Sequence, residues 1–232
     1  MAKVKKSSVI LTCLLLALLC GVLFYIEGNA SKYIIRITRL CAINIVLALS
    51  MNLVNGFTGI FSLGHAGFMA IGAYSVALLT IPVAKKETIF MLEPLIAPLN
   101  TLTLPFGVAL IIGGLLAAAL AFLIGLPCLR LRGDYLAIAT LGFSEIIRIV
   151  ITNAQCLTNG AQGLKSIPAT ANIWWCYGIA LATIIFIALL ISSSYGRAFK
   201  AIREDEIAAE SMGVSLLRHK MLSFMLSAFL AA

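Results

Sequence analysis

The sequence predicts an all-α, polytopic membrane protein, and three observations support this fold class. Hydrophobic residues make up 62% of the 232-residue chain, charged residues only 11%, and mean hydropathy is +1.07. A soluble domain carries roughly 25% charged residues. Three long stretches have no charge, Val9–Ile26, Leu40–Ala84 and Leu95–Leu129, and a spanning helix needs about 20 apolar residues. The short alternating segments of a transmembrane β-barrel are not seen.

Six segments are expected to cross the bilayer, and a seventh apolar run begins near Met221. The expected spans are 9–26, 37–55, 63–81, 105–127, 135–153 and 174–192. The first resembles a signal peptide, but its apolar core is long enough to span and its cleavage site is weak. About a dozen residues from Met221 onward are too few to cross. We therefore expect 1–232 to be a single transmembrane domain that is incomplete at its C-terminus.

Lysine and arginine are distributed unequally between the expected loops, which predicts a cytoplasmic N-terminus. The cytoplasmic segments would be 1–8, 56–62, 128–134 and 193–220, and they hold ten basic residues: Lys3, Lys5, Lys6, Arg130, Arg132, Arg197, Lys200, Arg203, Arg218 and Lys220. The outer segments, including loops 82–104 and 154–173, hold six: Lys32, Arg36, Arg39, Lys85, Lys86 and Lys165. This bias follows the positive-inside rule, although Lys32, Arg36 and Arg39 oppose it.

Composition also excludes several kinds of site. The net charge of +8 is explained by basic cytoplasmic loops rather than by nucleic-acid binding. The six cysteines are scattered, mostly within apolar runs, with no CxxC or Cys/His cluster, so neither a metal site nor a disulfide framework is expected. A GxxxxGK[ST] phosphate loop is missing from the sequence. We therefore expect no cofactor on this chain and no catalytic residues.

The most unusual stretch is NGFTGIFSLGHAGFMAIGAY, residues 55–74, which carries five glycines, a single histidine and no charge. Glycine breaks helices and allows close backbone approach. Asn52, Asn55, Gly64 and His65 are candidates to line a substrate pathway. The alternative is that His65 hydrogen-bonds backbone carbonyls that the glycine break leaves free.

Small residues at helical spacing predict close helix packing at two places. One set is Ala66, Ala70, Ala73 and Ala77, and the other is Gly114, Ala117, Ala121 and Gly125. Glu145 and Arg148 lie at membrane depth and three residues apart, so they can pair on one helix face. They are either a structural ion pair or part of the lining or gate of a pathway. Asp134 is expected to cap the helix that carries them.

The longest hydrophilic segment predicts an amphipathic helix over 197–213, ended by Gly213. Its charged residues are Arg197, Lys200, Arg203, Glu204, Asp205, Glu206 and Glu210. It can be a solvated loop helix, but apolar residues between the charges suit it to docking a soluble partner.

Four stretches in order resemble the LivM-type permeases of bacterial ABC transporters for branched-chain amino acids. They are MNLVNGFTGIFSLGHAGFMAIGAY, LRGDYLAIATLGFSEIIRIV, LTNGAQGLKSIP and GRAFKAIREDEIAAESMGVSLLRHKMLSFMLSA. The resemblance implies a multi-pass subunit of the bacterial plasma membrane in an importer of leucine, isoleucine or valine. It also implies a second homologous permease, two cytoplasmic ATPase subunits that use ATP and Mg, and an extracytoplasmic binding protein. Related members serve urea or short amides.

The same resemblance identifies 197–213 as the cytoplasmic helix that couples the ATPases to the permease. The family pattern there is EAA, three residues and Gly, and this sequence has IAAESMG at 207–213, with Glu206 one place early. The resemblance implies coupling roles for Arg197, Arg203, Glu204, Asp205, Glu206, Glu210 and Gly213. Two other classes stay open. An ion-gradient-driven carrier would use Glu145 as its ion site, and a structural scaffold would leave the coupling-like helix unexplained.

Overall fold

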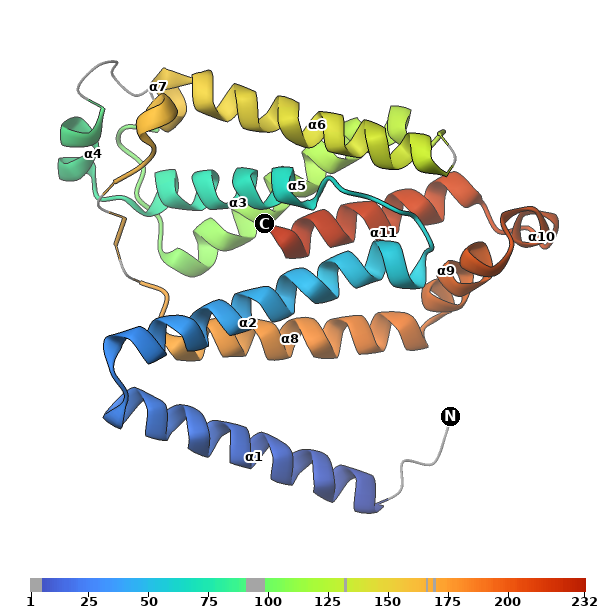
Figure 1. The fold of residues 1–232 in the computed structure, drawn as a ribbon, viewed down its shortest axis with the longest axis horizontal. Helices are drawn as coiled ribbons and strands as arrows, with labels where there is room; N and C mark the ends of the chain where they lie inside the picture. Colours follow the sequence, from blue (N-terminus) through green and yellow to red (C-terminus); the bar gives the residue numbers. More distant parts are fainter. Residues whose placement is uncertain (1–5, 91–98, 132, 166, 169) are drawn as a thin grey trace.

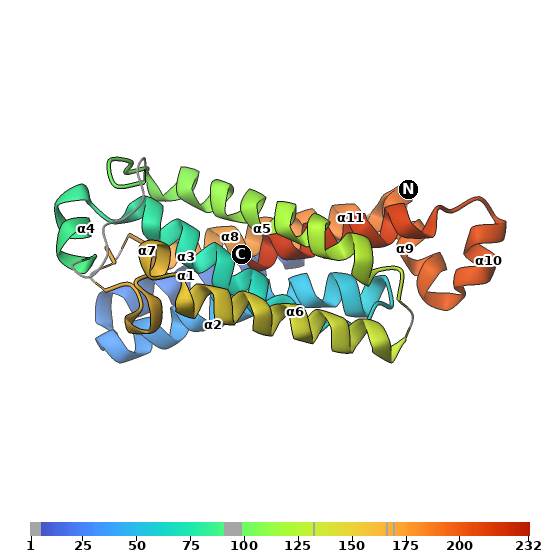
Figure 2. The ribbon, with the colours of Figure 1, turned by 90° about the horizontal axis from the view of Figure 1, so that it is seen from above.

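The computed structural model describes residues 6–90, 99–131, 133–165, 167–168 and 170–232. All secondary structure in these residues is helical. Figure 1 shows the long helices running lengthwise through one bundle, with α1 at its edge. Seen from above, they form more than one layer, with α5 on one side and α2 and α6 on the other (Figure 2). The protein is a helical membrane bundle, as its composition predicts.

Seven helices run along the bundle in the described part of the chain: α1 (Lys6–Asn29), α2 (Lys32–Asn52), α3 (His65–Thr80), α5 (Phe106–Cys128), α6 (Asp134–Asn153), α8 (Ile173–Ser192) and α11 (Leu216–Ala231). The shorter elements are the π-helix η1 (Leu53–Phe57), α4 (Val83–Ile89), α7 (Gln155–Thr158), the 3₁₀-helix η2 (Gly160–Gln162), α9 (Ser194–Glu204) and α10 (Glu206–Ser211).

Each of the six predicted spans corresponds to a helix. Four helices in the described residues are long and apolar enough to cross a membrane: Lys32–Phe57, Phe106–Cys128, Asp134–Asn153 and Ile173–Ser192. The other two predicted spans fall in α1 and α3, which contain shorter apolar helices, Ala17–Asn29 and His65–Thr80. The seventh run belongs to α11, which begins at Leu216, earlier than predicted.

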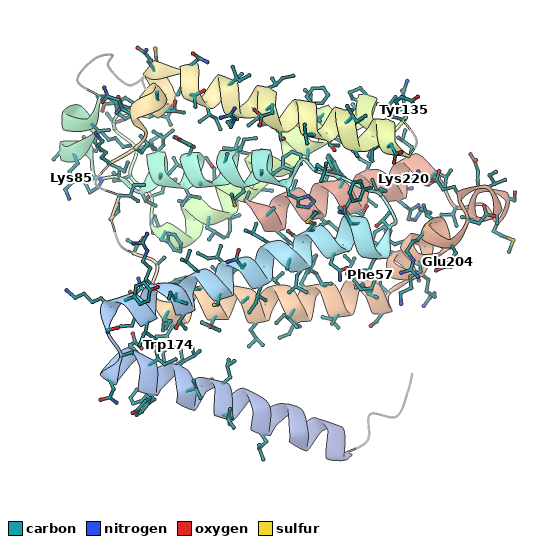
Figure 3. All side chains as sticks on the ribbon, in the orientation of Figure 1. Phe57, Lys85, Tyr135, Trp174, Glu204 and Lys220 are labelled. Atoms are coloured by element: carbon teal, nitrogen blue, oxygen red, sulfur yellow. The ribbon has the colours of Figure 1, made fainter. Side chains whose placement is uncertain are left out.

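The connections gather at two opposite ends of the bundle, as alternating spans require. Lys85 and Trp174 lie at one end, while Phe57, Tyr135, Glu204 and Lys220 lie at the other (Figure 3). These two sets come from the predicted outer and cytoplasmic sides respectively. Of the basic residues used for the orientation, Lys3, Lys5 and Arg132 lie outside the described residues, as do residues 91–98 of the outer loop.

The core is formed chiefly where α5, α3 and α11 meet. The small face predicted on α5 is confirmed, because Gly114, Ala117, Ala121 and Gly125 are all buried. A Cβ added at Gly114 would lie 3.2 Å from the backbone oxygen of Phe229 on α11. Small residues therefore let α5 and α11 approach closely, which is how helices associate in lipid.

The small face predicted on α3 is confirmed only in part, because Ala77 is buried and Ala70 is half-buried. Ala66 and Ala73 are exposed, and the buried residues near them are Gly67, Phe68 and Gly72. Phe68 stacks edge-on against Phe224 of α11, with ring centroids 5.4 Å apart. The face of α3 that contacts the bundle therefore includes Gly67, Phe68 and Gly72. A large side chain and small glycines fill the space there together, as close packing in protein interiors requires.

One cation of the outer loop is buried. The Lys86 side chain is 1% exposed, and its Nζ donates hydrogen bonds of 2.7 Å to the carbonyl oxygens of Leu99 and Leu102. Desolvation by burial lowers the pKa of Lys86, because burial disfavours the charged form. The neighbouring Lys85 is exposed. Lys86 therefore anchors the loop after α4 instead of facing solvent.

Candidate functional site

The glycine-broken stretch leaves the helical backbone inside the bundle. After η1 ends at Phe57, residues 58–64 form no regular helix, and α3 begins at His65. The chain turns back along the bundle here, so that α3 starts part-way along it (Figure 1). Thr58, Ile60, Ser62 and Gly64 are buried, alternating with exposed residues. The residues expected in the cytoplasmic segment 56–62 therefore begin at the inner end of the bundle and run back into it as non-helical backbone.

Internal hydrogen bonds satisfy the backbone of this stretch. Asn55 Oδ1 accepts a hydrogen bond of 3.2 Å from the Ser62 N–H, and Thr140 Oγ1 on α6 accepts one of 3.1 Å from the Leu63 N–H. Non-helical backbone at membrane depth is tolerated only where protein or a water-filled cavity satisfies it. Asn55 and Thr140 therefore stabilise the break between α2 and α3.

His65 connects three helices through one serine. Its Nε2 lies 2.6 Å from Ser227 Oγ on α11, and that hydroxyl donates a 2.8 Å hydrogen bond to the carbonyl oxygen of Ser50 on α2. A serine hydroxyl has one proton to donate. His65 Nε2 therefore carries a proton and donates to Ser227, which leaves Nδ1 as an acceptor. Within the described residues this buried Nδ1 has no hydrogen-bond partner.

This geometry agrees with the expectation that His65 bonds backbone near the glycine break. The backbone of Ser50 is a hydrogen-bond partner of the ring, and Ser227 joins the ring to the same residue's carbonyl oxygen. The ring also presents one unoccupied acceptor at the point where α3 begins. A helix start inside a membrane protein offers backbone N–H groups as well. The polar groups at this break can therefore bind a small polar ligand or a water.

The other predicted pathway residues do not join His65. Glu145 Oε2 accepts a 2.9 Å hydrogen bond from Arg148 Nε, and the two side chains are 50% and 69% exposed. Neither bonds His65 or Asn55 in the described part of the chain. Asn52 is exposed and lies against Gly56, where an added Cβ would clash with its Oδ1. Gly64 is buried and packs against Thr140 of α6.

The Glu145–Arg148 pair occupies an exposed face of α6 well inside the helix. Glu145 lies roughly 16 Å along α6 from its start at Asp134, at 1.5 Å per residue. A charge near the bilayer centre costs at least ~3 kcal/mol, so charged side chains there normally face protein or water. This face of α6 therefore calls for a protein or water neighbour, whether the pair is structural or lines a pathway.

The predicted amphipathic helix 197–213 is two helices. Asp205 adopts an extended conformation between α9 and α10, and its Oδ1 accepts hydrogen bonds from the N–H groups of Ile207 and Ala208 at 2.8 and 3.1 Å. This is an N-cap, which satisfies N–H groups that the new helix leaves free. Gly213, with φ +85°, follows the C-cap of α10. A cap that the helical spacing does not reveal breaks the predicted helix in two.

The charged residues of this segment have different surroundings. Arg197 donates to Ser194 Oγ at 2.9 Å, whereas Arg203 donates to the Gly56 carbonyl oxygen at 3.1 Å and pairs with Glu204. Glu206 pairs with Lys220.

Phe199 and Ile202 bury the inner face of α9, while Ile207 and Met212 at α10 are 73% and 85% exposed. Glu210, between them on α10, is also exposed. The segment therefore presents both charged and apolar side chains outward.

Four residues of these networks were not identified from the sequence: Ser50, Thr140, Lys220 and Ser227. Three of them are single hydroxyl residues in apolar helices, and polar side chains in such helices often bond across to neighbours. That signal was available but does not say which neighbour is bonded. Lys220 and Glu206 are 14 residues apart, so no helical spacing predicts their contact.

A helical bundle with an interruption between α2 and α3, and with charged, partly apolar helices at one end, defines the class of multi-pass helical membrane proteins. Residues 33–232 match the family "Branched-chain amino acid transport system / permease component". The chain belongs to this family. It is therefore a member of a family of transport-system permease components, and several of its described helices are long and apolar enough to cross a membrane.

Three relatives carry related names. The "High-affinity branched-chain amino acid transport system permease protein LivM" of Escherichia coli strain K12 is 37% identical over 87% of this chain, and its Salmonella typhimurium counterpart is 35% identical over the same share. A "Probable branched-chain amino acid transport permease protein LivM" of Methanocaldococcus jannaschii is 23% identical over 75% of the chain.

These alignments cover 51% of each of the first two relatives and 57% of the third, so the chain spans about half of their length. No solved structure matches the chain.

Proposed function

We propose that this chain is a membrane-spanning permease subunit of an ATP-driven importer for branched-chain amino acids. It would form the translocation pathway with a second homologous permease. The family match over residues 33–232 is the observation that carries the proposal. The names of the relatives, which refer to branched-chain amino acid transport, favour leucine, isoleucine and valine over urea or short amides.

The α9–α10 segment, at the cytoplasmic end of the bundle, is the proposed docking site for one of the two ATPase subunits that the importer would carry. Its exposed apolar residues Ile207 and Met212 can enter a groove on a soluble partner, as amphipathic helices do. Its charges, from Arg197 to Glu210, can orient that partner. ATP and Mg would act on the partner chains, and an extracytoplasmic binding protein would deliver substrate to the opposite end.

The break between α2 and α3 is the proposed part of the pathway within this chain. Asn55, Gly64 and His65 lie at this break. Asn52 and the Glu145–Arg148 pair stand apart from it, on exposed faces where a second permease or water can cover them. The pairing of Glu145 with Arg148 disfavours the gradient-driven alternative, because a carboxylate held by a guanidinium is a poor site for a transported proton or cation.

Uptake in proteoliposomes tests the proposal. The permease is reconstituted with the second permease, the ATPase subunits and the binding protein encoded beside it, and loaded with ATP and Mg. We expect radiolabelled leucine uptake that requires ATP and is blocked by vanadate, with unlabelled isoleucine and valine competing. Competition by urea or acetamide instead would reassign the substrate. Uptake that follows an ion gradient without ATP would overturn the proposal.

A further inference from the structure

A small polar cavity lies at the end of the bundle where α9 and α10 meet the core. It measures about 110 Å³, and its charged lining residues are Asp134, Glu206 and Lys220. They come from three different elements, α6, α10 and α11. Lys220 lies at this end of the bundle, close to the α9–α10 segment (Figure 3). One ammonium group and two carboxylates therefore line one small cavity.

Lys220 is the most buried of the three. It is 8% exposed, and its Nζ lies 2.5 Å from Glu206 Oε1. A charge this buried needs a partner, because an ammonium without one loses its hydration and gains nothing in return. Glu206 supplies that partner from α10. The pair therefore attaches the proposed ATPase-docking segment to α11.

Asp134 faces the same cavity without an ion-pair partner in the described part of the chain. The cap predicted for Asp134 is not formed: Gly133 is the N-cap of α6, and Asp134 stands in the first turn of a helix that no side-chain hydrogen bond caps. Because Asp134 lines the cavity together with Lys220, it is the carboxylate available to Lys220 if α10 moves away. Exchange between two carboxylates would keep the buried ammonium paired throughout such a movement.

Helix α11, which carries Lys220, also contacts the break between α2 and α3. Ser227 lies seven residues further along α11, roughly 10 Å at 1.5 Å per residue. It is the residue that bonds His65 of α3 and the Ser50 carbonyl of α2. A second contact joins α9 directly to the same break, since Arg203 donates a hydrogen bond to the Gly56 carbonyl oxygen. Movement of α9–α10 can therefore reach the α2–α3 break by two routes.

We propose that Lys220 is a positioning residue of the transport cycle, exchanging its carboxylate partner between Glu206 and Asp134. Bound to Glu206, as in this structure, it holds α10 on the bundle. Bound to Asp134, it releases α10 and leaves α11 held on α6. The inference rests on the proposed function, since it assigns a role to the segment proposed to dock the ATPases.

Variants of the assembled transporter in proteoliposomes test this role. The readouts are ATP hydrolysis stimulated by the loaded binding protein, leucine uptake, and their ratio. Asp134→Asn keeps the Glu206 pair but removes the alternative partner. We expect it to lower uptake per ATP about tenfold, within the usual range of coupling effects, while assembly is unchanged. Lys220→Met removes the ammonium that pairs with Glu206 and Asp134 in turn, so we expect it also to lower uptake per ATP.

Arg218→Gln is the matched control, because Arg218 is exposed two residues earlier on the same helix and lines no part of the cavity. It should keep the wild-type ratio. Asp134 is itself exposed, so its variant tests the inference even if Lys220→Met fails to assemble. If Asp134→Asn and Arg218→Gln give the same leucine uptake per ATP, while wild-type uptake depends on ATP, the proposed exchange of carboxylate partners is wrong but the proposed function stands. Wild-type uptake without ATP would overturn the proposed function and this inference with it.

Discussion

Buried polar side chains hold the centre of this bundle together. Ser227 is both acceptor for His65 Nε2 and donor to the Ser50 carbonyl, so one hydroxyl serves two helices besides its own. In an apolar environment each of these groups would be costly without a partner. The stability of the structure at the break therefore depends on individual hydrogen-bonding atoms more than on the apolar area that is buried.

Replacing Ser227 with alanine tests this dependence. The change leaves the His65 N–H and the Ser50 carbonyl without their partner, and an unsatisfied buried polar group costs about 1–3 kcal/mol. We expect a lower midpoint of thermal unfolding in detergent. Ser223→Ala is the control, because in the described part of the chain the Ser223 hydroxyl bonds the Lys220 carbonyl of its own helix and no neighbouring helix. Equal losses in the two variants would contradict the role of the His65–Ser227 contact.

At the scale of elements, two interruptions set the shape of the functional regions. The π-helix η1 and the non-helical stretch 58–64 separate α2 from α3. At the other interruption, the Asp205 cap separates α9 from α10. π-Helical turns are frequent at functional sites. In both places a side chain, Asn55 or Asp205, satisfies backbone groups that a continuous helix would have satisfied itself.

The Asp205 cap can be tested with a matched pair of substitutions. Asp205→Ala removes the acceptor for two N–H groups and should destabilise α10 by about 1 kcal/mol, whereas Asp205→Asn keeps a good cap. Amide hydrogen exchange over residues 206–211 should therefore speed up in the alanine variant and stay near wild type in the asparagine variant. Unchanged exchange in both variants would show that tertiary contacts, not the cap, hold α10.

For the whole molecule, the segregation of connections at two ends predicts access from opposite sides of the membrane. Lys85 and Lys200 are both exposed, Lys85 near α4 and Lys200 on α9. In a cysteine-free background, Lys85→Cys should react with a membrane-impermeant maleimide added outside cells. Lys200→Cys should react only after the membrane is opened. The reverse pattern would invert the proposed orientation without changing the fold.

The sequence predicted the helical class, the six spans and the position of the charged segment with good accuracy. The long uncharged runs identify spans, because a charge inside the bilayer is costly. The same logic placed small residues of α5 in the core. For α3 it was right only in part, because Ala77 is buried whereas Ala66 and Ala73 are exposed, and Phe68 and two glycines are buried instead. Composition along one helix does not reveal which neighbour packs against it.

For the candidate functional residues, too, some features could be predicted from the sequence and others could be seen only in the structure. The sequence by itself identified the glycine-broken stretch with His65, and the 197–213 segment, because their local chemistry is unusual for a membrane protein. Tertiary structure alone decided that His65 bonds Ser227, that Glu206 pairs with Lys220, and that Glu145 and Arg148 stand apart from the break. Local sequence sets the conformation and polarity of a segment over a few turns. Pairs formed across 14, 162 or 177 positions depend on how helices pack, which no spacing along the chain encodes.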